Sequence, residues 1–374
     1  QRRINSNATR RTLSRLRGCE EIVDKESFGV NRGHSFKVDM KICTKCFRDN
    51  EIKNFIINSG KVGTCECCGG SEDKVIDITE FSDFFGELLS LFEEDNSGKT
   101  LYELIQDNWE LFNSRNCADM VLQYLRNDQI TTFSINTKVR FIEDISESFG
   151  KWDDLKHSVK NKLRFFTDVT SENWDSFIMP NYVLQKGKIL YRARILPDGI
   201  AKLKPKEMGC PPPEKAIPGR ANPLGIPYLY LCTDKITTLY ETRSVYLDRV
   251  CIGSFRTIRN LNIVNFNESI NIFYAYGSAS EPLSEIVKHK NIIDSIRRDL
   301  SKPMRRFDTE IEYIPTQLIC EYCKLNGADG IIFASSLYNN GDNVVLFNPN
   351  DAKCTKVNMV EVTGVNIESE IINK

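Results

Sequence analysis

The stretch that decides the fold of the C-terminal half is Gly-Arg-Ala-Asn-Pro-Leu-Gly-Ile-Pro-Tyr-Leu-Tyr-Leu, at residues 219–231. Its first part closes a segment, residues 205–227, that holds seven of the thirteen prolines of the chain. Proline fixes the backbone and lacks an N–H donor, so this segment predicts a stiff loop. A loop of this length usually carries function rather than only connecting elements. Its last part, residues 228–231, predicts a strand.

Strand-like and helix-like stretches alternate on both sides of this loop. The expected strands are 188–195, 228–231, 250–255, 261–264, 330–333 and 343–347, and the expected helices are 235–246, 291–300 and 314–325. No Gly-x-Gly-x-x-Gly follows a strand and no P-loop sequence is present, which disfavours Rossmann and P-loop enzymes. We therefore expect a domain of mixed strands and helices.

Arginine, tyrosine, serine and a single carboxylate provide the candidate chemistry of this half. Arginine forks suit a pyrophosphate, a tyrosine ring can stack on a flat cationic ring, and a carboxylate can stabilise a developing positive charge. Such groups suit the N-glycosidic bond of NAD, because nicotinamide leaves as a neutral molecule and needs no general acid. The candidates are Arg192, Arg194, Arg220, Asn222, Tyr230, Glu241, Ser335 and Ser336.

Each of these residues also has an ordinary structural interpretation. Arg192 and Arg220 could be surface arginines, Glu241 could lie on a solvated helix face, and Ser335 could begin a turn. The chain has only three histidines, at 34, 157 and 289, which disfavours a histidine-rich metalloenzyme. Composition alone therefore leaves the function of this half open.

The order of the motifs narrows these possibilities. A pattern Gly-Arg-x-Asn-x-x-Gly-x-Pro-x-x-Tyr-Leu matches residues 219–231, and Glu241 follows about ten positions after its tyrosine. The later patterns Asp-Gly-Ile-x-Tyr-x-Ser and Gly-x-Asn-x-Val-Leu-Phe fall on residues 329–335 and 341–347. Phe333 replaces the common tyrosine, and Ala221 stands where a bulky aromatic is frequent. From about residue 191 to 349 the chain resembles a RES domain, a family named for its Arg, Glu and Ser.

This resemblance implies an α+β fold like that of the ADP-ribosyltransferases, with two small, roughly orthogonal β-sheets and NAD in the cleft between them. It also implies that Arg192 and Arg220 hold the pyrophosphate or ribose and that Tyr230 packs on the nicotinamide. Ser335 would hydrogen-bond the ribose or the amide, and Glu241 would stabilise the cationic transition state through the ribose 2′-hydroxyl. Arg194 and Asn222 are further binding candidates, and Ser336 is the alternative to Ser335 if the match slips by one residue.

Five cysteines nearer the N-terminus form a separate motif. Four of them have the spacing Cys43-x2-Cys46-x18-Cys65-x2-Cys68, which is typical of a four-cysteine zinc site. With four protein ligands the ion has no open position, so we expect structural Zn²⁺. Cys67 is the spare and could replace a neighbour as ligand. The singly placed cysteines are expected to be free thiols that behave as small hydrophobic residues, namely Cys117, Cys210, Cys232, Cys251 and Cys354.

A helical periodicity begins at about residue 77. Apolar residues at i, i+3 and i+4 spacing predict a helical bundle of about 100 residues, in which the aromatic side chains form the core. A cysteine knuckle followed by such a bundle resembles the HEPN-like module found before RES domains. The Arg-x4-6-His motif of HEPN ribonucleases is absent, which disfavours ribonuclease activity. The stripe comprises Ile78, Phe81, Phe84, Phe85, Leu88, Leu89 and Phe92.

Length and charge bound the remaining possibilities. The 374 residues carry a net charge of −1, and no apolar run approaches the ~20 residues that cross a bilayer, so we expect neither a membrane protein nor a general nucleic-acid binder. Six arginines in the first 17 residues suggest a basic arm or a transit peptide, and we expect a cytoplasmic protein. The predicted organisation is a basic arm at 1–36, a zinc ribbon at 37–76, a HEPN-like helical domain at 77–178 and a RES domain at 180–362.

The functional expectation is an NAD-consuming toxin or antiphage defence effector. It would cleave the nicotinamide–ribose bond of NAD⁺ with water or phosphate as acceptor, as a glycohydrolase or a phosphorylase. One alternative is an ADP-ribosyltransferase that modifies a macromolecule, and another is an inactive zinc-dependent regulatory protein. By family habit, a homo-oligomer and an antitoxin or regulatory partner are expected, although the N-terminal part could restrain the enzyme instead.

Overall fold

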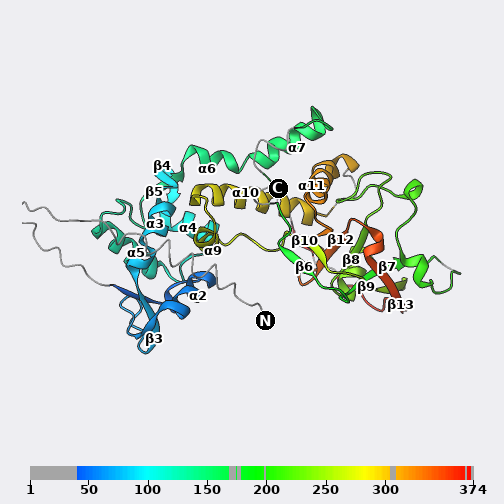
Figure 1. Ribbon diagram of the computed structural model, residues 1–374, viewed down its shortest axis with the longest axis horizontal. Coiled ribbons are helices and arrows are strands. Elements are labelled where there is room, and N and C mark those ends of the chain that lie inside the picture. The colour runs from blue at the N-terminus through cyan, green and yellow to red at the C-terminus, as the bar shows by residue number, and fades with distance from the viewer. Residues whose placement is uncertain are drawn as a thin grey trace, which may run out of the picture. The chain divides into compact units, whose positions relative to one another are not determined.

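The computed structural model describes residues 40–167, 174, 178–197, 199–303, 309–366 and 369–371 (Figure 1). The predicted basic arm, residues 1–36, lies outside this part of the chain. The described residues divide into two units. The first runs to Phe149 and includes Ile270–Lys290, and the second comprises Gly150–Ser269 and the chain from Asn291 onward. The units are therefore not contiguous in sequence, whereas the predicted ranges 77–178 and 180–362 are.

A small antiparallel sheet begins the first unit. Its strands are β1 (Lys41–Cys43), β2 (Lys61–Gly63) and β3 (Asp73–Asp77), in the order β1-β3-β2. A short 3-10 helix, η1 (Thr44–Cys46), follows β1, and helix α2 (Asn50–Ser59) follows η1. The carboxylate of Asp49 caps α2, because its Oδ1 accepts hydrogen bonds from the backbone N–H groups of Glu51 and Ile52.

Helices and a two-stranded sheet complete the first unit. The helices are η2 (Ile78–Phe81), α3 (Ser82–Leu89), α4 (Leu101–Trp109), α5 (Arg115–Asn127), α6 (Glu143–Ser148) and α9 (Ile272–Ser278), with the start of α10 (Leu283–Ser301). The predicted aromatic stripe is buried, which confirms that it forms the core. Its last member, Phe92, begins a strand instead: β4 (Phe92–Thr100) pairs with β5 (Lys138–Phe141). The charged sequence of β4 has no helical stripe of apolar residues. Backbone pairing with β5, rather than burial of an apolar helix face, therefore makes this segment a strand.

The second unit contains an eight-stranded sheet. Its strands are β6 (Tyr182–Leu184), β7 (Ile189–Ile195), β8 (Leu229–Cys232), β9 (Arg249–Thr257), β10 (Leu261–Asn265), β11 (Gly330–Ala334), β12 (Asp342–Leu346) and β13 (Ala352–Glu361). The order is β13-β9-β7-β8-β12-β11-β10-β6, and only the β10–β11 pair is parallel. The β7 and β8 strands join through a single residue pair, Tyr191 and Cys232. Two separate sheets were expected, and the structure instead has one sheet whose halves meet at this pair.

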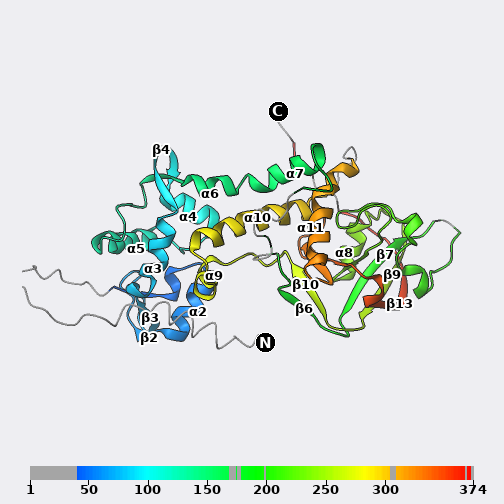
Figure 2. The ribbon, with the colours of Figure 1, turned by 45° about the horizontal axis from the view of Figure 1, so that its top comes forward.

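Helices complete the second unit. They are α7 (Lys151–Asn161), α8 (Lys235–Glu241), the later part of α10, and α11 (Ile314–Leu325), with four 3-10 turns, η4 (Pro205–Met208), η5 (Pro213–Lys215), η6 (Glu310–Tyr313) and η7 (Pro349–Asp351). Helix α8 packs against β7, β8 and β9, and α11 packs against β11 and α7 (Figure 2). The mixed α+β class is therefore confirmed. Among the described helices, none combines the length and apolar character that crossing a bilayer requires.

Two of the predicted helices have different bounds. The helix expected at 235–246 ends at Glu241, because Arg243 has a positive φ of 50° and leaves the helical conformation. Its start agrees, since Asp234 Oδ1 accepts a hydrogen bond from the Thr237 N–H and caps the helix. The helix expected at 291–300 is the second part of the longer α10.

Candidate active site

A cavity of about 380 Å³ lies in the second unit where the two halves of the sheet meet. Both members of the joining pair, Tyr191 and Cys232, line it. Because β7 and β8 pair at only one position, the strands part beyond it and leave space for side chains from α8 and the proline-rich loop. The walls are formed by Tyr191, Arg192, Ala193, Gly219, Arg220, Tyr230, Leu231, Cys232, Thr238, Glu241, Thr242, Arg243, Tyr313, Phe333, Leu337 and Asn343.

Glu241, the last residue of α8, provides the carboxylate of the cavity. Its Oε1 atom accepts two hydrogen bonds, from Ser335 Oγ at 2.7 Å and from Asn343 Nδ2 at 2.7 Å. The Oγ of Ser335 in turn accepts hydrogen bonds from the backbone N–H groups of Leu337 and Tyr338, each at 3.2 Å. Within the described residues, no hydrogen bond involves Glu241 Oε2. One carboxylate oxygen is thus fixed, and the other is left for a ligand.

Asn343 is a member of the site that sequence reasoning missed. It lies on β12, opposite Phe333 of β11 and Cys232 of β8. Its side chain is buried, and its Oδ1 accepts a hydrogen bond from Cys232 Sγ at 3.5 Å. The motif Gly-x-Asn contains this residue, but the strand register that brings it to Glu241 is a long-range property.

Arg192 lies in the middle of β7 and lines the cavity. Burial lowers the pKa of Arg192 below its ordinary value, although a guanidinium remains protonated in proteins. Its Nη1 atom is buried and has no hydrogen-bond partner among the described residues. A buried charged donor without a partner is costly, so an oxygen-bearing ligand in the cavity would satisfy it.

Arg194 and Ser336 lie outside the cavity, contrary to their predicted roles. Two residues further along β7, Arg194 uses its Nη2 to donate to the Gly209 carbonyl at 2.5 Å, so it ties the end of η4 to the sheet. Ser336 is exposed, whereas Ser335 is buried and contacts Glu241. Of the two serines, Ser335 is the one that contacts the carboxylate of the cavity.

Arg220 is held at the cavity by two helices. Its Nη1 donates to the Leu300 carbonyl at 2.9 Å, at the C-terminal end of α10, where free carbonyls carry partial negative charge. Its own carbonyl accepts a hydrogen bond from Thr316 Oγ1 of α11 at 2.7 Å. Gln317 Nε2, also on α11, donates to the Gly219 and Asn222 carbonyls. The start of α11 therefore fixes the backbone that presents Arg220.

Asn222 organises the loop from inside and does not line the cavity. Its Nδ2 donates to the carbonyls of Ile217, Pro223 and Ile226 at 3.1–3.2 Å. Its Oδ1 accepts a hydrogen bond from the Tyr230 hydroxyl at 2.7 Å. The resemblance suggested a ligand contact for Asn222, but both polar atoms of this buried side chain form hydrogen bonds with the loop and with Tyr230.

Tyr230 reaches the cavity with its hydroxyl already engaged. That hydroxyl donates to Asn222 and accepts from the Ala221 N–H at 3.1 Å. Burial raises the pKa of Tyr230, so the phenol stays neutral at physiological pH. A Cβ on Gly219 would lie 2.6 Å from the Tyr230 hydroxyl, so only glycine fits there. What Tyr230 offers a ligand is therefore its ring.

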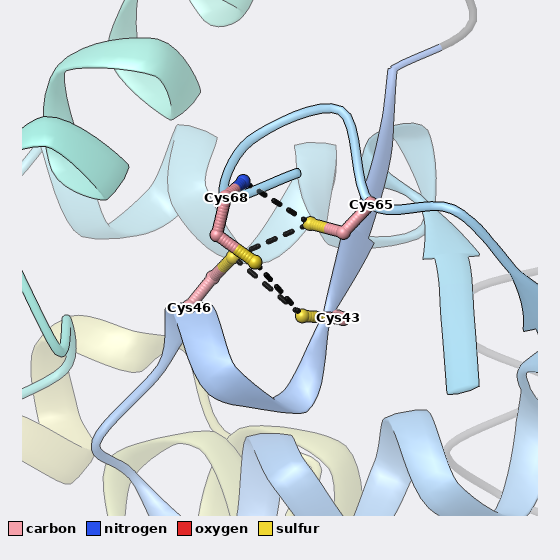
Figure 3. A group of neighbouring side chains, drawn as sticks. All are labelled: Cys43, Cys46, Cys65 and Cys68. Atoms are coloured by element: carbon pink, nitrogen blue, oxygen red, sulfur yellow. Dashed lines mark hydrogen bonds between the residues drawn. The ribbon is translucent and has the colours of Figure 1, made fainter. Parts of the chain in front are cut away.

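The four cysteines of the N-terminal motif come together in the first unit (Figure 3). Cys43 ends β1, Cys46 ends η1, and Cys65 and Cys68 lie in the turn after β2. The Sγ–Sγ distances are 3.9 Å for Cys43–Cys46 and 3.5 Å for both Cys43–Cys68 and Cys46–Cys65. Thiolates around one tetrahedral zinc, each at about 2.3 Å, lie about 3.8 Å apart. The four sulfurs therefore fit a bound metal ion.

Comparison with known proteins identifies a segment that includes most of the second unit together with Ile270–Lys290 of the first unit. Residues 189–363 match the RES domain. No curated protein is similar enough to match the chain. The match covers β7, which carries Arg192, as well as the loop of Arg220, Glu241 of α8 and Ser335 after β11. Residues 189–363 are therefore a RES domain.

Proposed function

We propose that this RES domain cleaves the nicotinamide–ribose bond of NAD⁺ and that the protein is an NAD-consuming toxin or defence effector. The RES family is linked to enzymatic processing of NAD. The observation that carries the proposal is the carboxylate of Glu241, which is fixed through Oε1 by Ser335 and Asn343 while Oε2 is left for a ligand. Arg192, Arg220 and Arg243 line the same cavity and supply its positive charge.

The chemistry of the bond explains why one fixed carboxylate suffices. Nicotinamide leaves NAD⁺ as a neutral ring, so no group has to protonate it. The ribose is left with oxocarbenium character, which a nearby carboxylate stabilises directly or through the 2′-hydroxyl, as in glycoside hydrolysis. A carboxylate held in place before the reaction has no reorganisation to undergo as the charge develops. Glu241 is the candidate catalytic residue.

The other walls supply binding groups for the rest of NAD⁺. The unpaired Nη1 of Arg192 and the guanidinium of Arg220 would hold the pyrophosphate or the ribose hydroxyls. The ring of Tyr230 would pack on the nicotinamide. Ser335 would act on the substrate only through Glu241, because its hydroxyl donates to that carboxylate. Water or phosphate would enter as acceptor and give ADP-ribose or its phosphate ester.

We further propose that the ion held by Cys43, Cys46, Cys65 and Cys68 is Zn²⁺. Four thiolates with tetrahedral spacing match the structural class of zinc site, and they leave no position for a reacting water. The ion would stabilise the small sheet and α2 and would take no part in NAD⁺ cleavage.

The test of NAD⁺ cleavage is incubation of the purified full chain with NAD⁺, with and without phosphate, followed by chromatography of nicotinamide and of the second product. Glu241→Gln preserves shape and removes the charge, so we expect nicotinamide release to fall by about 10²–10³-fold. The matched control is Glu214→Gln, an exposed glutamate of η5 that should leave the rate unchanged.

The second product distinguishes the alternatives. ADP-ribose identifies a glycohydrolase, and ADP-ribose phosphate identifies a phosphorylase. Nicotinamide released together with a modified macromolecule would favour the transferase. A folded protein that releases no nicotinamide, or a Glu241→Gln variant as active as the wild type, would contradict the proposal.

A further inference from the structure

A second group of buried cysteines adjoins the four-cysteine cluster. The Sγ atoms of Cys46, Cys67 and Cys117 all lie within 4.8 Å of one another. The three side chains are buried, with exposed fractions of 0%, 6% and 5%. Cys46 belongs to both groups, so six thiols meet around it. No sequence motif predicts this group, because Cys117 is 50 positions from Cys67.

Two different elements bring these thiols together. Cys67 lies in the turn between Cys65 and Cys68, and it contributes to the second group rather than to the first. Cys117 is the third residue of α5, whose N-cap Ser114 accepts a hydrogen bond from the Cys117 N–H at 3.2 Å. The fold thus places the buried Cys117 thiol beside a cysteine of the four-cysteine cluster.

The donor set defines the kind of ion that fits. All three donors are sulfur, and soft thiolate ligands select closed-shell cations such as Zn²⁺ and Cu⁺ over the oxygen-seeking Mg²⁺ and Ca²⁺. Three sulfurs at about 2.3 Å from one ion lie about 4 Å apart in a trigonal arrangement. Sulfur atoms that all lie within 4.8 Å of one another are compatible with this geometry. All three cysteines are free in the structure and none forms a disulfide.

We propose that Cys46, Cys67 and Cys117 form a second metal site, which takes a soft closed-shell cation and shares the Cys46 sulfur with the four-cysteine site. The first unit then contains a two-ion cluster of six thiolates, bridged by Cys46. The second ion ties the start of α5 to the turn at Cys65–Cys68. This proposal concerns the first unit alone and does not depend on NAD⁺ cleavage.

The direct test is cadmium-113 NMR of the full chain after exchange with ¹¹³Cd²⁺. Two ions bridged by one sulfur give two signals, and each signal splits the other through the shared thiolate. We expect this pair of coupled signals. A single signal, or two signals without coupling, would overturn the bridged cluster, and the measurement needs no variant that might fail to fold.

Metal content gives the second test. We expect two zinc ions per chain in the zinc-loaded wild type, and one in Cys67→Ser and in Cys117→Ser. The matched control Cys354→Ser changes a partly buried cysteine of β13 and should retain two. One ion in the zinc-loaded wild type, or a disulfide between Cys67 and Cys117 in the protein as purified, would refute the site.

Discussion

At the scale of single residues, two hydrogen bonds fix the Oε1 atom of Glu241, whose carboxylate lines the cavity. Ser335 and Asn343 each donate to that oxygen at 2.7 Å, and neither needs to touch a substrate to matter. Hydrogen bonds to charged groups contribute about 1.5–3 kcal/mol. Both residues are therefore positioning residues, and losing either one should misplace the carboxylate in the transition state.

We expect Ser335→Ala and Asn343→Ala each to lower kcat for nicotinamide release by about 10–100-fold with little change in KM. The reason is that the carboxylate acts on charge that develops only in the transition state. Ser336→Ala is the matched control, because Ser336 is exposed and should leave kcat unchanged. Steady-state kinetics on the three variants tests this. A loss confined to Ser336→Ala, or a rise in KM alone, would contradict the positioning role.

The residue scale also shows what the sequence could predict. Arg192, Arg220, Tyr230 and Glu241 line one cavity, as the motif order suggested. The Ser335 hydroxyl donates a hydrogen bond to the Glu241 carboxylate at this cavity. Asn343 could not be predicted, because its role depends on the register of β12 against β11 and β8.

At the scale of elements, the proline-rich loop depends on one buried side chain. Asn222 joins three loop carbonyls and the Tyr230 hydroxyl, and α11 binds the loop backbone through Thr316 and Gln317. A loop of this length has few packed apolar side chains, so these hydrogen bonds hold it in shape. The conformation that presents Arg220 follows from that network.

We expect Asn222→Ala to lower the free energy of unfolding by about 2–3 kcal/mol, because it leaves several buried polar groups without partners. It should also raise KM for NAD⁺, since Arg220 loses its fixed position. Leu224→Ala, at an exposed position of the same loop, should change neither quantity. Denaturant unfolding and kinetics measure both. Unchanged stability in Asn222→Ala would show that the loop is held by other contacts.

Element types were easier to predict than their ends and their pairing. The helix at 314–325 has its predicted bounds, and proline near its start suits the first turn. Helix α8 is shorter than expected because Arg243 adopts a left-handed conformation. The pairing of β4 with β5 was missed, because the strands are 37 residues apart, β4 shows no alternation of apolar residues, and the alternation of β5 covers only four residues.

At the scale of the whole molecule, the described residues of each unit form apolar clusters of their own. The core of the first unit contains the phenylalanines around Phe81 together with residues of the distant segment Ile270–Lys290, such as Phe273, whose ring centroid lies 5.1 Å from that of Phe84. The core of the second unit is built from the strands of the eight-stranded sheet. Sequence periodicity indicated which residues are buried, but it held no information on which distant segment joins which core.

Among the described residues, the cysteines proposed to bind metal lie in the first unit, which predicts a selective effect of chelation. The cysteines Cys43, Cys46 and Cys65 are part of the first core, so removing the ion leaves buried thiols without their common partner and unlinks the small sheet from the turn that follows it. For structural sites, the free energy of metal binding is part of the free energy of folding. We therefore expect a strong chelator to lower the thermal transition of the first unit and to leave that of the second unit in place. Calorimetry with and without chelator, combined with an assay of nicotinamide release, measures this. The transition of the second unit and the release should both persist, and adding Zn²⁺ back should restore the lost transition. If chelation instead lowers both transitions together, the units unfold as one; if it removes the ion and shifts neither, the metal has no structural role.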